Sequence, residues 1–254
     1  MNRTCELQIK SASLGLLLAA ALAGPLCRAQ SAPLTTGITT LPGGRVQLAI
    51  TNNSAVPVTA FAVYIEWTLP GGGPKAHSVR IVDSVINYPR DREIMPGDAQ
   101  RFVFGGVMRM SDRAVSPPRI TFEAAVFADG STFGDPGWAQ RIVQDRENVY
   151  ENAGRAIQEL LSARDSIETR KELISRFDAL RDQVLHSALY QGIVGRYQGI
   201  IATLPFDNVL TNLQHAVVAG RGLAPMDTLT PILIAQLRKT RQRLYASKPS
   251  VTSP

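Results

Sequence analysis

The pattern of hydrophobic and polar positions changes its period near residue 136. Before that point, short runs alternate apolar and polar residues, as strands with one buried face do. Beyond it, apolar residues recur every three or four positions, as they do on amphipathic helices. The pattern therefore predicts an α+β protein of two units, an antiparallel β-sandwich over 30–135 and a helical domain over 136–247.

Several short strands are expected in the first unit, beginning with one inside 31–40. Turn clusters at Asn52-Asn53-Ser54 and Met95-Pro96-Gly97-Asp98 separate them, and the Gly/Pro-rich run 69–74 is expected to be an exposed loop. Met108 and Met110 are expected to continue the last of these apolar faces. The clearest inward-facing residues are Val46, Leu48 and Ile50, then Phe61, Val63, Ile65 and Trp67, then Phe102 and Phe104.

The stretch 120–138 joins the two units. Asp129-Gly130 predicts a two-residue type I′ turn, because both positions tolerate positive φ. That turn pairs Val126 with Phe133, and places both with Phe122 on the face toward the sandwich core. Asp135-Pro136 then predicts an N-cap followed by proline at the first helical position.

The strand region resembles the immunoglobulin-like or fibronectin III-like modules of secreted bacterial proteins. The resemblance covers about 34–135 and rests on an Asn-rich turn after VQLAI, an apolar strand ending at Trp67, and a Pro-Gly-Asp turn before a Phe-x-Phe strand. Such modules imply a binding or spacing role. The paired cysteines of antibody domains are missing.

About five helices are expected in the second unit. The first runs over 136–163, and Asp165-Ser166-Ile167-Glu168 predicts a capping box that opens the second. The third, from Tyr190, is expected to end at Pro205, and the fourth to stop before Gly220. Thr230-Pro231 is expected to begin the fifth, and 248–254 is expected to be a disordered tail.

The N-terminus predicts export. Arg3 and Lys10 precede an apolar run that is too short to span a membrane, and Cys27-Arg28-Ala29 fits a signal-peptidase site before Gln30. We expect a cleaved signal peptide, 1–29, and a secreted or periplasmic protein. A lipid anchor at Cys27 is the alternative. Both cysteines, Cys5 and Cys27, lie in this segment, so the mature chain has neither disulfides nor thiolate metal sites.

The basic charge of the mature chain is concentrated at its C-terminal end. The signal carries three of the 27 basic and one of the 21 acidic residues, which leaves a net charge of +4. Five cations and no acid follow Gln236, and without these five the charge is close to zero. This distribution does not indicate a nucleic-acid-binding protein, and no later run predicts a transmembrane segment.

Two features of the helical half are candidate partner-binding sites. Tyr190-Gln-Gly-Ile-Val recurs as Tyr197-Gln-Gly-Ile-Ile, so that Gly192, Gly195 and Gly199 fall inside a predicted helix. Each glycine costs about 1 kcal/mol there. Close approach of another helix would explain them, and so would a cleft lined by both tyrosines.

The other candidate is the basic segment of Arg238, Lys239, Arg241 and Arg243. These cations would complement the dipole at a helix C-terminus, or they would contact an anionic polymer or lipid surface.

Catalytic patterns are scarce. His77, His186 and His215 have no metal-ligand spacing, and we expect no metal, no cofactor and no catalytic residue. The sequence therefore favours a non-catalytic binding or assembly protein of the bacterial cell envelope, which acts through its helical region and its basic C-terminal tail. An envelope protein or an anionic polymer is the expected partner. The alternative is an unrecognised envelope hydrolase with a site between the two units.

Overall fold

The computed structural model describes residues 32–68, 75–87, 90–104, 118–165, 169–187, 190, 192–218 and 222–247. The predicted signal segment, the loop 69–74, the continuation at Met108 and Met110, and the tail from Lys248 lie outside these residues.

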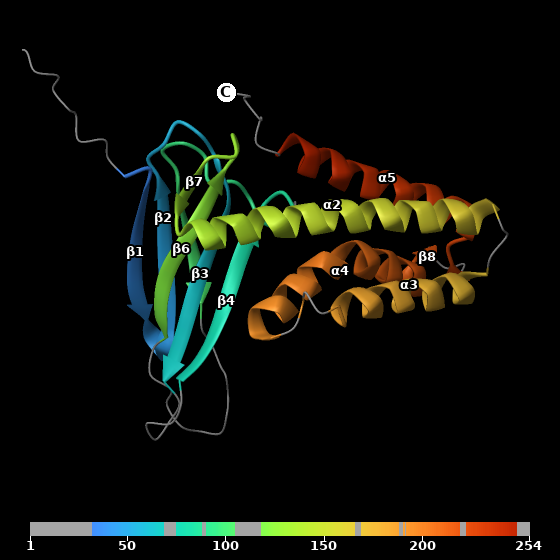
Figure 1. The fold of residues 1–254 in the computed structure, drawn as a ribbon, viewed down its shortest axis with the longest axis horizontal. Helices are drawn as coiled ribbons and strands as arrows, with labels where there is room; N and C mark the ends of the chain where they lie inside the picture. The colour runs from blue at the N-terminus through green and yellow to red at the C-terminus, as the bar shows by residue number, and fades with distance from the viewer. Residues whose placement is uncertain are drawn as a thin grey trace, which may run out of the picture. The chain divides into compact units, whose positions relative to one another are not determined.

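Strands occupy the N-terminal part of the chain and helices the C-terminal part, which confirms the α+β class (Figure 1). One antiparallel sheet has the order β1-β2-β5, and the other has the order β4-β3-β6-β7. The first contains β1 (Leu34–Leu41), β2 (Arg45–Asn52) and β5 (Ala99–Phe104), with the 3-10 turn η1 (Pro42–Gly44) between β1 and β2. The second contains β3 (Val58–Thr68), β4 (Lys75–Asp83), β6 (Arg119–Phe127) and β7 (Thr132–Gly134).

Side chains from both sheets share one hydrophobic cluster. Phe61 of β3 lies edge-on to Phe102 of β5, with ring centroids 4.7 Å apart. The inward-facing residues predicted for β2, β3 and β5 all belong to this cluster or pack against it, which confirms the period-2 assignment there.

A β-bulge in β6 corrects the prediction for that strand. Phe122 pairs with Val63 and Ala124 pairs with Ala62, so Glu123 has no partner across the ladder. One extra residue reverses the alternation, because side chains follow a strict period of two. Phe122 therefore lies against the cluster between the sheets, whereas Val126 belongs to a separate cluster that contains Ile142 of the first helix. The expected common face of Phe122 and Val126 is wrong.

The predicted turn between β6 and β7 is also one residue too short. The amide of Phe127 donates to the carbonyl of Ser131 (2.9 Å), and the amide of Gly130 donates to the carbonyl of Phe127 (3.0 Å). This is a three-residue loop in which Gly130 has φ 84°. Phe133 consequently pairs with Ala125 rather than with Val126. Asp129 stabilises the loop by accepting from both the amide and the hydroxyl of Ser131.

Four α-helices and a two-residue strand pair make up the described C-terminal part. They are α2 (Pro136–Asp165), α3 (Arg170–Leu185), α4 (Gly192–His215) and α5 (Met226–Ala246), with β8 (Val217–Val218) paired to β9 (Gly222–Leu223). Asp135 accepts the amide of Trp138 (2.9 Å), which confirms the N-cap predicted for α2. None of these helices is both long and apolar enough to cross a membrane.

Three predicted helix boundaries are wrong. Pro205 lies inside α4 and Pro231 inside α5, so the third and fourth predicted helices are one. A proline inside a helix costs about 3 kcal/mol, and burial of Ala202, Phe206 and Val209 around Pro205 offsets that cost. The capping box that opens α3 is Thr169 with Glu172, four residues after the expected one.

Helix α2 packs on both the sheet and the other helices. Near its start, Trp138 and Ile142 pack with Ala60, Ala62 and Val126 on the outer face of the four-stranded sheet. Farther along, it contributes Ala153, Ala156, Ile157 and Leu160 to the core that it shares with α3, α4 and α5. Strands and helices belong to one compact unit, Pro33–Pro254. Independent folding of 30–135 and 136–247 stays a prediction.

Candidate binding site

The site begins at the open edge of β4. In the described sheet β4 pairs only with β3, so one side of its backbone has no strand partner. The hydroxyl of Tyr197 on α4 accepts from the amide of Ile81 and donates to the carbonyl of the same residue, both at 3.2 Å. Ile81 therefore turns its backbone groups away from β3, and alternation along an antiparallel strand points those of Val79 the same way. Tyr197 occupies one position on an edge that a further strand could continue.

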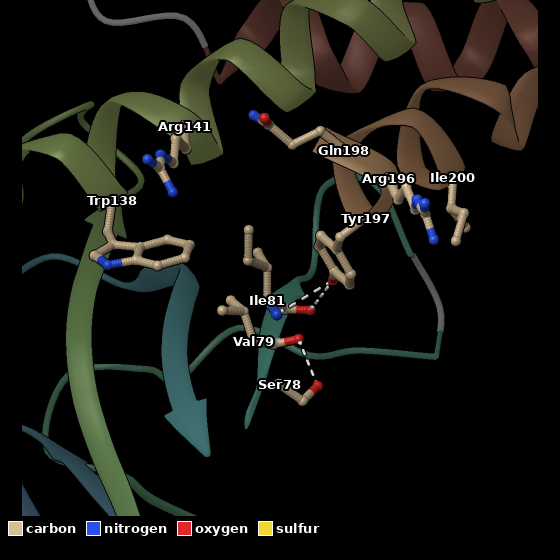
Figure 2. A pocket seen from close by; sticks show the side chains of 9 residues that line it. All are labelled: Ser78, Val79, Ile81, Trp138, Arg141, Arg196, Tyr197, Gln198 and Ile200. Carbon is tan, nitrogen blue, oxygen red and sulfur yellow. Dashed lines mark hydrogen bonds between the residues drawn. The ribbon is translucent and has the colours of Figure 1, made fainter. Parts of the chain in front are cut away.

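A hollow of about 210 Å³ lies beside this edge. Figure 2 shows its walls: Ser78, Val79 and Ile81 of β4, Trp138 and Arg141 of α2, and Arg196, Tyr197, Gln198 and Ile200 of α4. The Arg141 guanidinium lies over the Trp138 ring, 4.6 Å from its centroid. Apolar surface comes from Trp138, Val79, Ile81 and Ile200, and positive charge comes from Arg141 and Arg196. No carboxylate is among the described residues that line the hollow.

A buried polar network lies next to the hollow and joins α2 to the sheet. Arg146 of α2 donates from Nε to Asp83 Oδ2 (2.8 Å) and from Nη2 to Asp83 Oδ1 (3.2 Å). Its Nη2 also donates to Thr59 Oγ1 (2.9 Å). The side chains of Arg146 and Asp83 are 6% and 3% exposed, so this pair is shielded from water. The bidentate pair ties α2 to Asp83, the last residue of β4, in one orientation.

Asp145, the residue before Arg146 on α2, has a buried carboxyl group that is only partly hydrogen-bonded. Its Oδ1 accepts from Nε2 of Gln198 (3.2 Å), a residue of the hollow, whereas its Oδ2 is buried without a hydrogen-bond partner. Burial raises the pKa of Asp145 to about 7, and the nearby Asp83 charge adds to the increase. The Gln198 hydrogen bond and the Arg141 charge act in the opposite direction.

The structure separates the two tyrosines of the repeat. Tyr197 lines the hollow, and burial raises its pKa, so that its hydroxyl stays neutral and can both donate and accept. Tyr190 precedes α4 and packs against the helical core instead. A Cβ on Gly195 would lie 2.6 Å from the Tyr190 carbonyl carbon, and one on Gly199 would lie 3.1 Å from the Tyr190 Cβ. The absence of a side chain at Gly195 and Gly199 therefore leaves room for Tyr190. The close approach of another helix was one of the two expected explanations.

The predicted basic segment lies on α5, and its four cations differ in environment. Arg238 and Lys239 are exposed. Arg241 lies over the Tyr150 ring at 4.2 Å, and Arg243 donates to Thr240 Oγ1 at 3.3 Å. Arg238 and Lys239 therefore present their charges to solvent. None of the four cations lines the hollow beside β4.

None of the three histidines is among the residues that line the hollow. The His77 ring stacks on Tyr64 with centroids 5.8 Å apart, His186 Nδ1 is 2.7 Å from the carbonyl oxygen of Asp182, and His215 ends α4. Across the described residues, no group of three or more histidine, cysteine or acidic side chains is placed to hold a metal ion.

Comparison with models of protein families finds no match, and comparison with curated proteins finds none either. Among solved structures, a Bordetella pertussis protein provisionally named ApaA matches with 15% sequence identity and a TM-score of 0.26. The match covers 41% of this chain and 94% of that chain. Similarity at this level carries no argument about fold or function.

Sequence reasoning found Tyr197 but missed Trp138, Arg141, Arg196 and Asp145 as neighbours of a site. Trp138 and Arg141 lie three residues apart, a spacing that puts both on one side of α2, and this was the available signal. Their meeting with Arg196 depends on the packing of α4 against β4, which no local pattern contains.

Proposed function

We propose that the chain is an exported, non-catalytic binding or assembly protein of the bacterial cell envelope. Its partner is an envelope protein that presents an extended acidic segment to the hollow between β4, α2 and α4. The observation that carries this proposal is the combination of an open strand edge with Trp138 and two exposed arginines in one hollow.

Each wall matches one property of such a segment. An extended chain adds main-chain hydrogen bonds along an exposed strand edge, and its alternate side chains enter pockets. Here the outward amide of Val79 offers such a bond, and its carbonyl, which accepts from Ser78 Oγ at 3.4 Å, keeps a second lone pair. Trp138 with Ile200 offers an apolar pocket. Arg141 and Arg196 would face acidic side chains. Exposed charges of this kind speed association with acidic partners and disfavour basic ones.

Two further parts of the chain have roles in this proposal. Arg238 and Lys239 extend the positive field along α5 and speed association without direct contact in the hollow. The two sheets form an immunoglobulin-like sandwich that supports β4 as a rigid edge. Shared burial of Phe61 and Phe102 between the sheets supports this arrangement.

Photo-crosslinking in the cells that produce the protein tests the proposal. Ile200 lines the hollow and is 55% exposed, so p-benzoylphenylalanine at this position would reach a bound segment. Ile38 on β1 is 54% exposed and is the matched control. We expect a discrete adduct from position 200 and none from position 38. No adduct from position 200, or the same adduct from both, would contradict the proposal.

A further inference from the structure

The open edge of β4 continues past the hollow toward the start of the strand. Ile81 and Val79 direct their backbone groups away from β3, and the same alternation extends to His77 and Lys75. In the described part of the sheet, no strand pairs with this side of β4. The Tyr197 hydroxyl bonds to both backbone groups of Ile81 and closes the edge there. The part with which a partner strand can pair therefore runs from Lys75 to Val79.

An aromatic pair lies beside this edge, on the same face of the sheet as the hollow. Ile81 packs with Trp138 on the face that α2 partly covers. Because side chains alternate along a strand, Val79 and His77 point to that face as well. The His77 ring stacks on Tyr64 of β3, with centroids 5.8 Å apart and an angle of 21° between the ring planes. His77 is exposed, so the pair presents an aromatic ring to solvent next to the open edge.

The charge closest to this end of the edge is already paired. Lys75 Nζ donates to Glu66 Oε1 at 2.8 Å, and this hydrogen bond lowers the pKa of Glu66. Arg119 also faces Glu66, from β6 on the side of β3 away from the edge. The hollow, by contrast, has Arg141 and Arg196 in its walls. A segment that pairs with the edge therefore meets arginines at the hollow, and farther along an aromatic ring beside an ion pair.

We propose that the partner-binding surface extends from the hollow along β4 to Lys75, and that it recognises a short linear motif. In this motif an apolar residue fills the hollow, and an aromatic residue two positions away packs against the open side of His77. This inference rests on the proposed function, because it takes the hollow as the place where the partner binds. It adds the length of the contact and the kind of side chain that the second position selects.

The dimensions of an added strand support this spacing. Such a strand lies about 4.8 Å from β4, and its side chains on one face recur about every 6.8 Å. The residue opposite Val79 directs its side chain toward the hollow, and the next residue on that face lies opposite His77. Directly opposed residues bring their Cβ atoms to about 5 Å, a distance at which aromatic rings pack edge-to-face or offset-stacked. The residue between them points to the other face and contacts neither the hollow nor the ring pair.

Photo-crosslinking from a second position, in the cells that produce the protein, tests the extent of the surface. p-Benzoylphenylalanine at position 77 replaces the exposed ring at the edge. Thr121 is the matched control, because it is exposed and pairs with Tyr64 on the same face, but lies on β6, away from the edge. We expect position 77 to give the same adduct as position 200, and position 121 to give none. Sequencing of the crosslinked peptides should place both attachment sites in one segment, with an aromatic residue two positions from the residue that position 200 labels.

Substitution of His77 in the protein that carries the crosslinker at position 200 tests the ring contact. With only a minor fraction crosslinked, His77→Ala should lower the adduct yield about two- to tenfold, the range that one aromatic pair contributes to affinity. His77→Phe keeps an aromatic ring and should restore the yield. Thr121→Ala changes an exposed residue away from the edge and should leave the yield unchanged. A comparison of melting temperatures separates loss of binding from loss of folding.

The outcomes distinguish this inference from the proposed function on which it rests. An adduct from position 200 and none from position 77 overturns the extended surface and leaves the hollow as the binding site. A labelled segment without an aromatic residue at that spacing, or equal yields for His77→Ala and His77→Phe, overturns the motif. No adduct from either position contradicts the proposed function and this inference with it.

Discussion

Replacement of Asp145 by asparagine should remove most of the pH dependence of stability between pH 5 and pH 8. Asp145 is 2% exposed, and only one of its carboxylate oxygens has a hydrogen-bond partner. Asparagine has nearly the same shape and keeps an oxygen that can accept the Gln198 bond. It cannot ionise, so the cost of a buried charge is absent at every pH.

The sign and the size of the effect follow from the raised pKa. The pKa of Asp145 rises from 3.8 to about 7 on folding, so between these values the folded chain holds a proton that the unfolded chain has released. The free energy of unfolding therefore falls as pH increases through this window. At about 1.4 kcal/mol for each pKa unit, the full loss is about 4 kcal/mol. Roughly 2.5 kcal/mol of it falls between pH 5 and pH 8.

Urea unfolding of wild type and Asp145→Asn at four pH values, at constant ionic strength, measures this loss. For a chain of this size it corresponds to a difference of about 5–10 °C in melting temperature. Asp98→Asn is the control, because Asp98 lies on an exposed turn and its side chain forms none of the described hydrogen bonds. If the stability difference between wild type and Asp145→Asn is the same at pH 5 and pH 8, the buried-carboxyl account is wrong.

Two further pairs of substitutions test how the site is built. Asp83→Ala leaves the Arg146 guanidinium buried without its carboxylate and also removes the acceptor of the Val85 and Ile86 amides, so it should cost about 3–5 kcal/mol in urea unfolding. The double variant with Arg146→Met should recover the part that comes from the unpaired charge; an additive double variant would contradict this pairing. Gly195→Ala should destabilise the chain because its Cβ meets the Tyr190 backbone. Gly154→Ala, whose Cβ would meet the Arg241 guanidinium at an ordinary van der Waals distance of 3.4 Å, should raise stability by up to about 1 kcal/mol. Equal effects at the two glycines would refute the close packing of Tyr190.

The local patterns predicted the strands well but failed where one residue alters the register. Val46, Leu48 and Ile50 face the core as expected, because nothing interrupts their alternation. In β6 the bulge at Glu123 exchanges the two faces, and no residue in that run is a glycine or proline that would indicate it. The predicted helix end at Pro205 is wrong for a different reason. The local signal of a proline is strong, but the packing around Phe206 outweighs it.

The candidate site was only partly accessible to sequence reasoning. The tyrosine–glycine repeat pointed to Tyr197, but it treated Tyr190 as an equal partner, because Tyr190 was placed within the same helix. In the structure Tyr190 lies before α4 and packs against Gly195 and Gly199. Nothing in the local pattern distinguishes Asp145 from other charged residues of a helix. Its burial depends on the packing of α4 against α2, an association between segments more than 50 residues apart in the chain.

The central claim is that the hollow beside β4, rather than α5, holds the partner. Charge reversal in the protein that carries the crosslinker at position 200 tests it most directly. One variant combines Arg141→Glu with Arg196→Glu, and the other combines Arg238→Glu with Lys239→Glu, so that both change the net charge equally. With melting temperatures unchanged, we predict that the first pair abolishes the adduct and that the second lowers its yield only at low salt. An adduct that survives reversal in the hollow, or one that disappears on reversal in α5 alone, would contradict the claim.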